Sequence, residues 1–363
     1  MSKKLLIQAY DIIPHGVSSY IGGIGRSNVE LLSALSKIPD KDIDIHIYCN
    51  GKNCIGFQHY GWNFGYHPFP FPSHISNYRT SFESWYRKYI IGYDLLHYTN
   101  NVGNMRWDTQ FVVTIHDMYR YNLSPWNKQH FHECANKSSG IVTCSNFSKE
   151  EIVNILKVEP SKVSVIPWGI SHSLFHAYSE RDIESILRKY NIKDKYFFAC
   201  SCSNPRKNGD VIAEAAHLLA DKTISVVLAW SNPPKKLLDN YQKEIESRQL
   251  IFLNYLSDEE LAILYTGALA SIFVSSFEGF GFPILESMAC GTPCITCKNS
   301  SLIEVGGNLA FYVKEKDSND LADAMRSFTK NNEINSNEMI SYSQGFSWEK
   351  TAREYIRFYK KYL

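Results

Sequence analysis

The sequence predicts an α/β protein made of two domains, each built around a parallel β-sheet. The chain has 363 residues, and a typical domain length of about 150 residues gives two domains. In both halves, apolar runs with the length of buried strands are separated by segments with helical periodicity. Residues 270–296 combine these signals as an apolar run, a glycine-rich loop, a helix beginning near Pro283 and a second apolar run. That order is typical of a parallel sheet.

In the first half, apolar runs predict strands at residues 4–9, 43–49, 111–117, 140–145 and 163–169. Residues 27–36 have apolar side chains at three- and four-residue spacing, which predicts a helix after the first strand. Residues 49–76 contain three closely spaced prolines and are predicted to be a loop. Residues 77–91 are predicted to be an aromatic, basic helix, and Ser148 with Glu151 has the spacing of a capping box.

The second half begins at residue 196, after a polar connection at residues 171–195 that we expect to be the linker. Its apolar runs predict strands at residues 196–200, 224–229, 250–253, 270–274 and 294–296. Helices are predicted at residues 210–219, 235–247 and 284–290, and Ser257 with Glu260 forms a second capping box. We therefore expect an N-terminal domain at residues 1–170 and a C-terminal domain at residues 196–346.

The composition narrows the classes of function. The formal net charge is +1, which gives no electrostatic argument for binding nucleic acid. No apolar run approaches the roughly 20 residues of a membrane span, and the first apolar run is too short for a signal peptide, so we expect a cytoplasmic protein. The nine cysteines are scattered, which is typical of reduced, buried thiols. Cys294 and Cys297 are three apart on a predicted strand and face opposite sides, so they do not favour a metal site.

The loop at residues 275–283 carries residue types suited to a ligand. Gly279 and Gly281 let the backbone approach a ligand closely, and the N-terminus of the following helix presents free amides that suit phosphate. The carboxylate of Glu286 can accept hydrogen bonds from two adjacent ribose hydroxyls, and Glu278 on the loop is placed to contact a sugar. The alternative is that both glutamates are solvated charges near a helix end.

Arg206 and Lys207 follow the first strand of the second half and stand before a helix. Arginine provides a planar, bidentate fork and lysine a compact positive charge, so together they are suited to clamping a diphosphate. The alternative, two solvated surface cations, holds for most Arg-Lys pairs.

Two features of the first half are weaker signals. The glycine-rich turn with Gly23 and Gly25 lies between the first strand and the first helix, a position that suits phosphate. It lacks the third glycine of the dinucleotide-binding pattern, and the chain contains no GxxxxGK[ST] sequence, so NAD and P-loop ATP binding are disfavoured. His116 and Asp117 end a buried strand, where side chains face the ligand edge of a parallel sheet. A lone histidine is more often structural.

The segment from Glu278 to Glu286, together with residues 289–293, resembles the E-x7-E signature of the family 4 retaining glycosyltransferases. The resemblance covers nearly the whole chain and is strongest at residues 205–304. It implies the α/β fold called GT-B, in which two Rossmann-like domains face a central cleft. It also implies that the last helix, at residues 347–363, returns to the N-terminal domain.

The resemblance implies roles for individual positions. The glycine-rich turn would face the donor phosphates and the acceptor, His116 would contact the donor sugar, and Arg206 with Lys207 would hold the diphosphate. Some family members carry a Gly-Arg pair slightly earlier, where Ser201 and Cys202 stand here, so the charge rests on Arg206 and Lys207. The remaining implied donor contacts are the base-side Tyr255 and the residues Glu278, Gly279, Phe280, Gly281, Phe282 and Glu286.

These roles predict a retaining glycosyltransferase that uses a nucleotide-diphospho sugar without a metal ion or other cofactor. His116, Glu278, Arg206 and Lys207 are the predicted catalytic residues, and the cations stabilise the departing nucleoside diphosphate. The motifs resemble bacterial O-antigen and lipopolysaccharide mannosyl- and rhamnosyltransferases, which favours GDP-mannose as donor and a glycan or lipid-linked saccharide as acceptor.

Other activities are compatible with parts of this pattern. A GT-B sugar phosphorylase or a sugar-nucleotide epimerase uses the same fold and clamp, and both stay open as alternatives. A glycoside hydrolase is disfavoured because its two carboxylates flank the scissile bond from opposite sides. A sugar-binding protein without catalysis would not need the phosphate clamp.

A lipid-linked acceptor would bring the protein to the inner surface of the membrane. In the predicted helix at residues 77–91, one aromatic face is formed by Tyr78, Phe82, Trp85 and Tyr89. The cations that flank this face and would meet anionic headgroups are Arg79, Arg87 and Lys88. The alternative is that the aromatic face packs on the core of the N-terminal domain.

Overall fold

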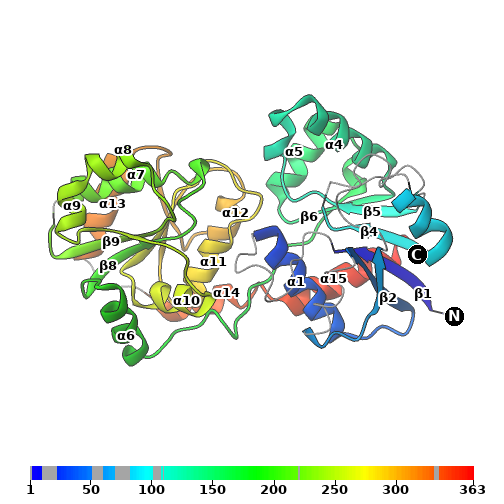
Figure 1. The fold of residues 1–363 in the computed structure, drawn as a ribbon, viewed down its shortest axis with the longest axis horizontal. Helices are drawn as coiled ribbons and strands as arrows, with labels where there is room; N and C mark the ends of the chain where they lie inside the picture. The colour runs from blue at the N-terminus through cyan, green and yellow to red at the C-terminus, as the bar shows by residue number, and fades with distance from the viewer. Residues whose placement is uncertain are drawn as a thin grey trace. The chain divides into compact units, whose positions relative to one another are not determined.

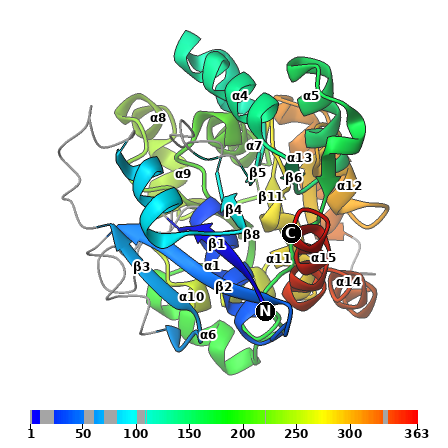
Figure 2. The ribbon, with the colours of Figure 1, turned by 90° about the vertical axis from the view of Figure 1, so that its right-hand side faces the viewer.

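The computed structural model describes residues 2–9, 23–50, 60–69, 82–100, 108, 110–219, 221–330 and 335–363. The chain divides into two compact units, Met1–Gly169 with Ser347–Leu363 and Ile170–Phe346. Each unit contains one parallel sheet with helices on both of its faces (Figures 1 and 2). This is the predicted α/β class.

The first unit has a seven-stranded parallel sheet in the order β3-β2-β1-β4-β5-β6-β7. Its strands are β1 (Lys3–Gln8), β2 (Ile43–Asn50), β3 (Gly65–Phe69), β4 (Leu95–Tyr98), β5 (Phe111–Thr114), β6 (Gly140–Thr143) and β7 (Val163–Val165). Its longer helices are α1 (Gly23–Ser36), α4 (Pro125–Lys137), α5 (Asn146–Leu156) and α15 (Trp348–Lys360). Helices α1 and α15 pack on one face of the sheet, and α4 and α5 pack on the other (Figure 1).

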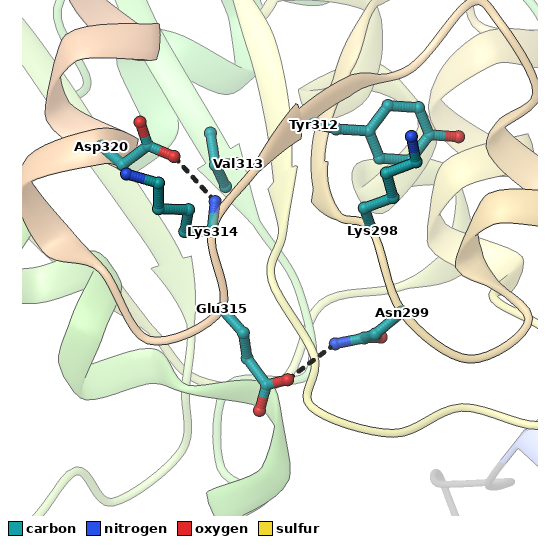
Figure 3. Close-up of a pocket in the computed structure, with 7 residues that line it drawn as sticks. All are labelled: Lys298, Asn299, Tyr312, Val313, Lys314, Glu315 and Asp320. Atoms are coloured by element: carbon teal, nitrogen blue, oxygen red, sulfur yellow. Dashed lines mark hydrogen bonds between the residues drawn. The ribbon is translucent and has the colours of Figure 1, made fainter.

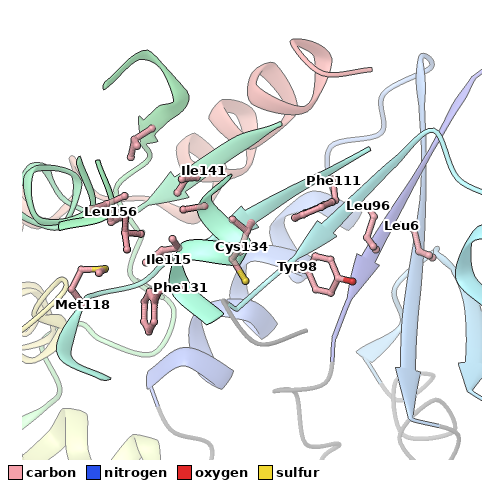
Figure 4. Packing of buried hydrophobic residues seen from close by; sticks show 14 of the residues in the cluster. Leu6, Leu96, Tyr98, Phe111, Ile115, Met118, Phe131, Cys134, Ile141 and Leu156 are labelled. Carbon is pink, nitrogen blue, oxygen red and sulfur yellow. The ribbon is translucent and has the colours of Figure 1, made fainter. Parts of the chain in front are cut away.

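The core of this unit lies between the sheet and helices α4 and α5 (Figure 4). Strands β4, β5 and β6 are buried along their whole length, as is usual for parallel strands that are covered on both faces. Apolar side chains from these strands meet Phe131 of α4 and Leu156 of α5. The sheet of this unit is therefore anchored by packing along β4, β5 and β6.

Strand β3 lies in the segment 49–76 that the sequence predicts to be a loop. It is an edge strand, paired only with β2 among the described strands. An edge strand hydrogen-bonds along one side, so it tolerates Pro68, which has no backbone N–H to donate. The prolines exclude a central strand but do not exclude an edge strand.

Two helices of the first unit begin earlier than predicted. Helix α1 includes Gly23 and Gly25 in its first turn, so these glycines do not form a loop before the helix. Helix α5 has Ser145 as its N-cap, and Ser145 Oγ accepts a hydrogen bond from the backbone N–H of Ser148. The predicted capping box of Ser148 and Glu151 is therefore wrong, because both residues lie inside the helix.

The predicted aromatic helix is described from residue 82 onward, and Tyr78 and Arg79 lie outside the described residues. Residues 82–86 are α-helical and Arg87–Ile91 form a π-helix. The predicted contact of Arg87 with lipid headgroups is wrong. Its side chain is 1% exposed, and its Nη2 lies 2.7 Å from Oδ2 of Asp108. The guanidinium is buried because this carboxylate compensates its charge inside the protein.

The second unit has a six-stranded parallel sheet in the order β10-β9-β8-β11-β12-β13. Its strands are β8 (Lys195–Ala199), β9 (Ile224–Ala229), β10 (Leu250–Leu253), β11 (Ala270–Phe273), β12 (Cys294–Cys297) and β13 (Phe311–Val313). Its helices are α6 (Glu180–Tyr190), α7 (Gly209–Leu219), α8 (Lys235–Asn240), α9 (Gln242–Glu246), α10 (Asp258–Gly267), α11 (Phe282–Ala289), α12 (Leu302–Gly306), α13 (Ser318–Lys330) and α14 (Ser336–Ser343). Helix α7 packs with α13, and α10 packs with α6 and α11.

The residues predicted to link the domains belong to the second unit, which begins at Ile170. Within them, helix α6 begins with a capping box of Ser179 and Asp182 and packs against α10. The polar composition of this segment reflects a surface helix and not a separate linker. The capping box of Ser257 and Glu260 at the start of α10 is confirmed, whereas the helix predicted at residues 235–247 is divided into α8 and α9.

The chain passes between the units at two neighbouring points. In the first unit, Thr351 Oγ1 donates to the carbonyl of Pro167 at 2.8 Å, and a Cβ on Gly169 would lie 2.1 Å from the backbone N of Trp348. In the second unit, Ile170 N donates to Phe346 O at 3.1 Å. The last helix therefore belongs to the first unit. Among the described residues, no helix is long and apolar enough to cross a membrane.

Candidate functional site

Two loops that leave neighbouring strands of the second unit bring the predicted site residues together. Strands β8 and β11 pair in parallel, so the loops at their carboxyl ends share one edge of the sheet. Asn208 joins these loops, because its Nδ2 donates to Val274 O at 2.7 Å and to Ser276 Oγ at 3.0 Å. The backbone N–H of Ser276 donates to Arg206 O at 2.8 Å. Sequence reasoning missed the joining role of Asn208, although its place beside Lys207 was the available signal.

Arg206, Lys207 and Glu278 form one cluster of charges. Lys207 Nζ is paired with Glu278 Oε1, and Arg206 Nη2 lies 3.6 Å from Glu278 Oε2. The ammonium of Lys207 also lies 4.4 Å from the ring centre of Phe273, a cation–π contact. The alternative of solvated surface cations is excluded for Lys207, whose side chain is 11% exposed. Because two cations share one carboxylate, the three side chains carry one net positive charge at the end of the sheet.

The loop that carries Glu278 is held by two serines that sequence reasoning missed. Glu278 N donates to Ser300 Oγ at 3.2 Å. The hydroxyl of Ser301 lies 2.9 Å from Glu278 O and 2.7 Å from Phe280 O, and donates to these carbonyls. The serine pair just before α12 was the available signal. These bonds fix the backbone of the loop, so its amides have a defined direction.

Helix α11 begins at the end of this loop, two residues earlier than predicted. Gly281 is its N-cap and has φ +116°. Residues with a Cβ rarely adopt this backbone conformation, so the position favours glycine. Gly291, after the helix, has φ +80°, as expected of a residue that ends a helix. Phe280 is 3% exposed and packs edge-on against Phe282, so its ring belongs to the core.

Glu286 and Tyr255 stand in different surroundings. Glu286 lies on α11, is 4% exposed, and its Oε2 accepts a hydrogen bond from the hydroxyl of Tyr265 at 3.3 Å. The alternative that Glu286 is a solvated helix-end charge is therefore wrong. Tyr255 is 56% exposed on the segment after β10, two strands away from β8. Tyr255 thus follows a strand that is not a neighbour of β8 or β11, and its predicted contact with the base stays a prediction.

A pocket of about 390 Å³ lies at the carboxyl ends of β12 and β13 (Figure 3). Its lining residues are Lys298, Asn299, Tyr312, Val313, Lys314, Glu315 and Asp320. Asn299 connects this pocket to the loop before Glu278, because its Nδ2 donates to Ser275 O at 3.2 Å and to Glu315 Oε2 at 3.1 Å. Sequence reasoning did not identify this pocket, since its polar residues come from two separate strand ends with no common motif.

In the first unit, His116 and Asp117 follow β5 and have different partners. The His116 ring is 5% exposed, and its Nε2 is hydrogen-bonded to Thr99 O at 2.8 Å. Asp117 Oδ1 accepts from the backbone N–H of Tyr119 at 3.0 Å. Nearby on α5, burial and the charge of Asp117 raise the pKa of Glu151 to about 7. His116 is therefore held in a fixed orientation, and its predicted contact with the sugar stays a prediction.

Two family models match the chain. The model described as Glycosyl transferases group 1 matches residues 182–345, and the model described as Glycosyltransferase Family 4 matches residues 21–174. Each match falls almost wholly within one of the two units, and together the two models cover most of the chain.

Several curated proteins are similar in sequence. O-antigen chain mannosyltransferase B of Escherichia coli is 26% identical over 268 residues, which cover 69% of this chain and 70% of that protein. O-antigen chain mannosyltransferase RfbU of Salmonella typhimurium is 27% identical over 316 residues, covering 81% and 84%. The serotype-specific mannosyltransferase WbdA of Escherichia coli is 26% identical over 241 residues, which are 62% of this chain but only 29% of WbdA.

Solved structures share the fold of this chain. HepE of Anabaena, in complex with UDP-glucose, has a TM-score of 0.76 and 16% identity, with 99% of this chain and 100% of that chain covered. Sucrose-phosphate synthase from Thermosynechococcus elongatus has a TM-score of 0.77 and 16% identity, covering 99% and 98%. These similarities show the fold alone, with its two Rossmann-like domains.

Proposed function

Because the chain belongs to glycosyltransferase family 4 and has the GT-B fold, we propose that it transfers a hexose from a nucleotide-diphospho sugar to a saccharide acceptor, with retention of anomeric configuration. The observation that carries the proposal is the cluster of Arg206, Lys207 and Glu278, which joins the loop before α7 to the loop before α11. Its net positive charge and the free amides of the helix suit a diphosphate.

In this reaction the bond between the anomeric carbon and the diphosphate oxygen breaks, and the acceptor hydroxyl forms a new bond to the same face of that carbon. The acceptor proton passes to the departing diphosphate. Arg206 and Lys207 stabilise the negative charge that gathers on the leaving group. When the donor binds, the cations turn from Glu278 to the diphosphate, and the released carboxylate can accept hydrogen bonds from sugar hydroxyls. This route needs no metal ion.

The donor and acceptor are proposed from the relatives. Similarity to the O-antigen chain mannosyltransferases of Escherichia coli and Salmonella typhimurium leads us to propose GDP-mannose as the donor and a growing O-antigen or lipopolysaccharide chain as the acceptor. HepE, which binds UDP-glucose, makes UDP the second candidate.

Thermal unfolding with GDP, UDP and dTDP tests the donor, because specific binding stabilises the folded protein by RT ln(1 + [L]/Kd) and so raises its melting temperature. A nucleoside diphosphate should then be released from the matching sugar donor when an acceptor is added. Equal melting temperatures with all three nucleotides would contradict the proposed donor site. Release of sugar phosphate with inorganic phosphate, or conversion of the donor sugar without acceptor, would instead identify the phosphorylase or the epimerase.

Association with the inner membrane surface stays part of the proposal. Phe82, Trp85 and Tyr89 are 40, 39 and 56% exposed, so they do not pack fully on the core. With Lys88 beside them they form an apolar and basic surface that suits anionic lipid. Co-sedimentation with vesicles of anionic phospholipid at low salt should capture the parent protein, and replacing the three aromatic residues with serine should abolish capture. Failure of the parent to bind would rule this association out.

A further inference from the structure

Glu286 carries a carboxyl group that is almost fully buried. The residue is 4% exposed on α11, and a buried carboxylate is stable only when hydrogen-bond donors surround it. One such donor is the hydroxyl of Tyr265, which lies 3.3 Å from Glu286 Oε2. Tyr265 belongs to the neighbouring helix α10 and is itself 1% exposed. The side chain of Glu286 is therefore held in part by a second helix.

The position of Tyr265 is fixed by several contacts. Thr292, in the loop after α11, donates from Oγ1 to the backbone O of Tyr265 at 2.7 Å. The Tyr265 ring packs edge-on against Phe198 of β8, with ring centres 5.2 Å apart. Its hydroxyl oxygen also lies 3.1 Å from Sγ of Cys200. Burial raises the pKa of Tyr265 well above its usual value, so the hydroxyl keeps its proton and remains a donor.

This hydroxyl has one hydrogen to donate and two acceptors within reach. A carboxylate oxygen is a much stronger acceptor than the sulfur of a thiol, so the hydrogen is directed to Glu286. At 3.3 Å this hydrogen bond to the carboxylate is long, so it orients the carboxylate more weakly than a short bond would. The carboxylate has about four acceptor positions, more than one tyrosine hydroxyl can use.

We propose that Tyr265 is a positioning residue that orients the Glu286 carboxylate to receive both ribose hydroxyls of the donor. The inference rests on the proposed function, because it takes Glu286 as the ribose contact. It also narrows the donor to a ribonucleotide sugar, since a 2′-deoxyribose offers one hydroxyl fewer to the oriented carboxylate.

The test removes the hydroxyl and compares ligands that do and do not carry the ribose hydroxyls. Tyr265→Phe keeps the ring and loses only the donor. Tyr196→Phe is the matched control, because Tyr196 is fully buried on β8 and its hydroxyl donates to the backbone O of Leu264 at 2.8 Å. The probes are GDP and UDP, each with its 2′,3′-dideoxy form, and calorimetry gives the dissociation constants.

Tyr265→Phe should weaken binding of the ribonucleotide about tenfold, the effect of one hydrogen bond to a charged group, and leave the dideoxy form unchanged. The KM for the sugar donor should rise by the same factor with kcat unchanged, because the contact exists in both ground and transition states. Tyr196→Phe should change neither quantity. Equal weakening of both forms by Tyr265→Phe, or no weakening, would overturn the inference.

Glu286→Ala distinguishes failure of the proposed ribose contact from failure of the positioning role of Tyr265. If the parent protein does not distinguish the ribonucleotide from the dideoxy form, or if Glu286→Ala keeps the distinction, the ribose contact itself is wrong. If Glu286→Ala removes the distinction while Tyr265→Phe keeps it, the ribose contact stands and the positioning role of Tyr265 is wrong.

Discussion

Each unit of the protein pairs an arginine with a carboxylate, and the two arrangements differ in burial and in charge balance. In the first unit, Arg87 and Asp108 are 2.7 Å apart, with side chains 1% and 0% exposed. In the second unit, Arg206 and Lys207 share Glu278, and the three side chains are 21, 11 and 9% exposed. The first pair is closed to solvent, and the second cluster remains partly accessible.

The surroundings of the two carboxylates explain the difference. Besides Arg87, the hydroxyls of Tyr98, Tyr93 and Ser84 donate to Asp108 at 2.6, 2.7 and 3.0 Å. These donors use the roughly four acceptor positions of a carboxylate, so the charge pair is complete without a ligand. Two cations meet at Glu278, and the cluster keeps one net positive charge. A saturated buried pair holds a fold together, whereas a partly exposed excess charge keeps capacity for an anionic ligand.

The largest expected effect comes from breaking the saturated pair. Arg87→Met leaves the Asp108 carboxylate buried without its cation, which typically lowers the free energy of unfolding by about 3–5 kcal/mol. Urea unfolding at neutral pH measures the loss. Arg206→Met is the control in the second unit and should lower stability by less than about 1 kcal/mol, because a partly exposed ion pair contributes little. Similar losses of stability in both variants would contradict the proposed difference between the buried pair and the partly exposed cluster.

The next largest effect is on turnover and comes from removing a cation of the partly exposed cluster. Lys207→Ala should lower the rate of sugar transfer about 10²-fold or more, the scale of losing one preorganised electrostatic contact. Since Lys207 packs over Phe273, its loss should also lower stability by about 1 kcal/mol. Steady-state kinetics, with the donor that thermal unfolding identifies, measures the change in turnover. Lys236→Ala, which changes an exposed lysine on α8, should leave turnover unchanged, and normal turnover of the Lys207 variant would contradict the clamp.

The sequence predicted the second unit better than the first. The strands around Glu278 and the helix at Pro283 follow from local patterns, because glycine, proline and strand ends fix them over a few residues. The joint location of Arg206, Lys207 and Glu278 was implied by the family resemblance. The edge strand β3 has no such pattern, since pairing on one side requires neither a continuous apolar run nor the absence of proline.

Burial of polar side chains was the least predictable property. Arg87 and Lys88 are neighbours in a basic stretch, but Arg87 is buried with the distant partners Asp108 and Tyr98. Ser300, Ser301 and Tyr265 were missed for the same reason, since their partners lie about 20 residues away in the chain. Contacts of this kind depend on the packing of helices on the sheet, which local periodicity does not determine.

The stability of the first unit should depend on pH through a buried carboxyl group beside Arg87. Glu83, next to the Arg87 pair, has its pKa raised from 4.5 to about 7, chiefly by burial. The folded protein therefore holds the Glu83 proton more tightly than the unfolded chain, and stability contributed by this group is lost as pH rises from about 4.5 to 7. Glu83→Gln should remove that loss, so the variant should gain about 2 kcal/mol over the parent between about pH 5 and 8. Urea unfolding across this range tests it, and parallel pH profiles would contradict the assignment.

The smallest expected effect concerns the carboxylate that the two cations share. In Glu278→Gln the side chain keeps its shape and loses the charge that competes for Arg206 and Lys207. Free nucleoside diphosphate should then bind as tightly as to the parent or a few-fold more tightly, because the phosphates no longer displace a carboxylate. Turnover should fall about tenfold, equivalent to about 1.4 kcal/mol, since the neutral amide is a weaker acceptor for the sugar hydroxyls. Calorimetry with the nucleotide and steady-state kinetics give the two numbers separately. If affinity and turnover fell together, Glu278 would be needed to hold the cations in place, and the second cluster would resemble the saturated pair of Arg87 and Asp108 after all.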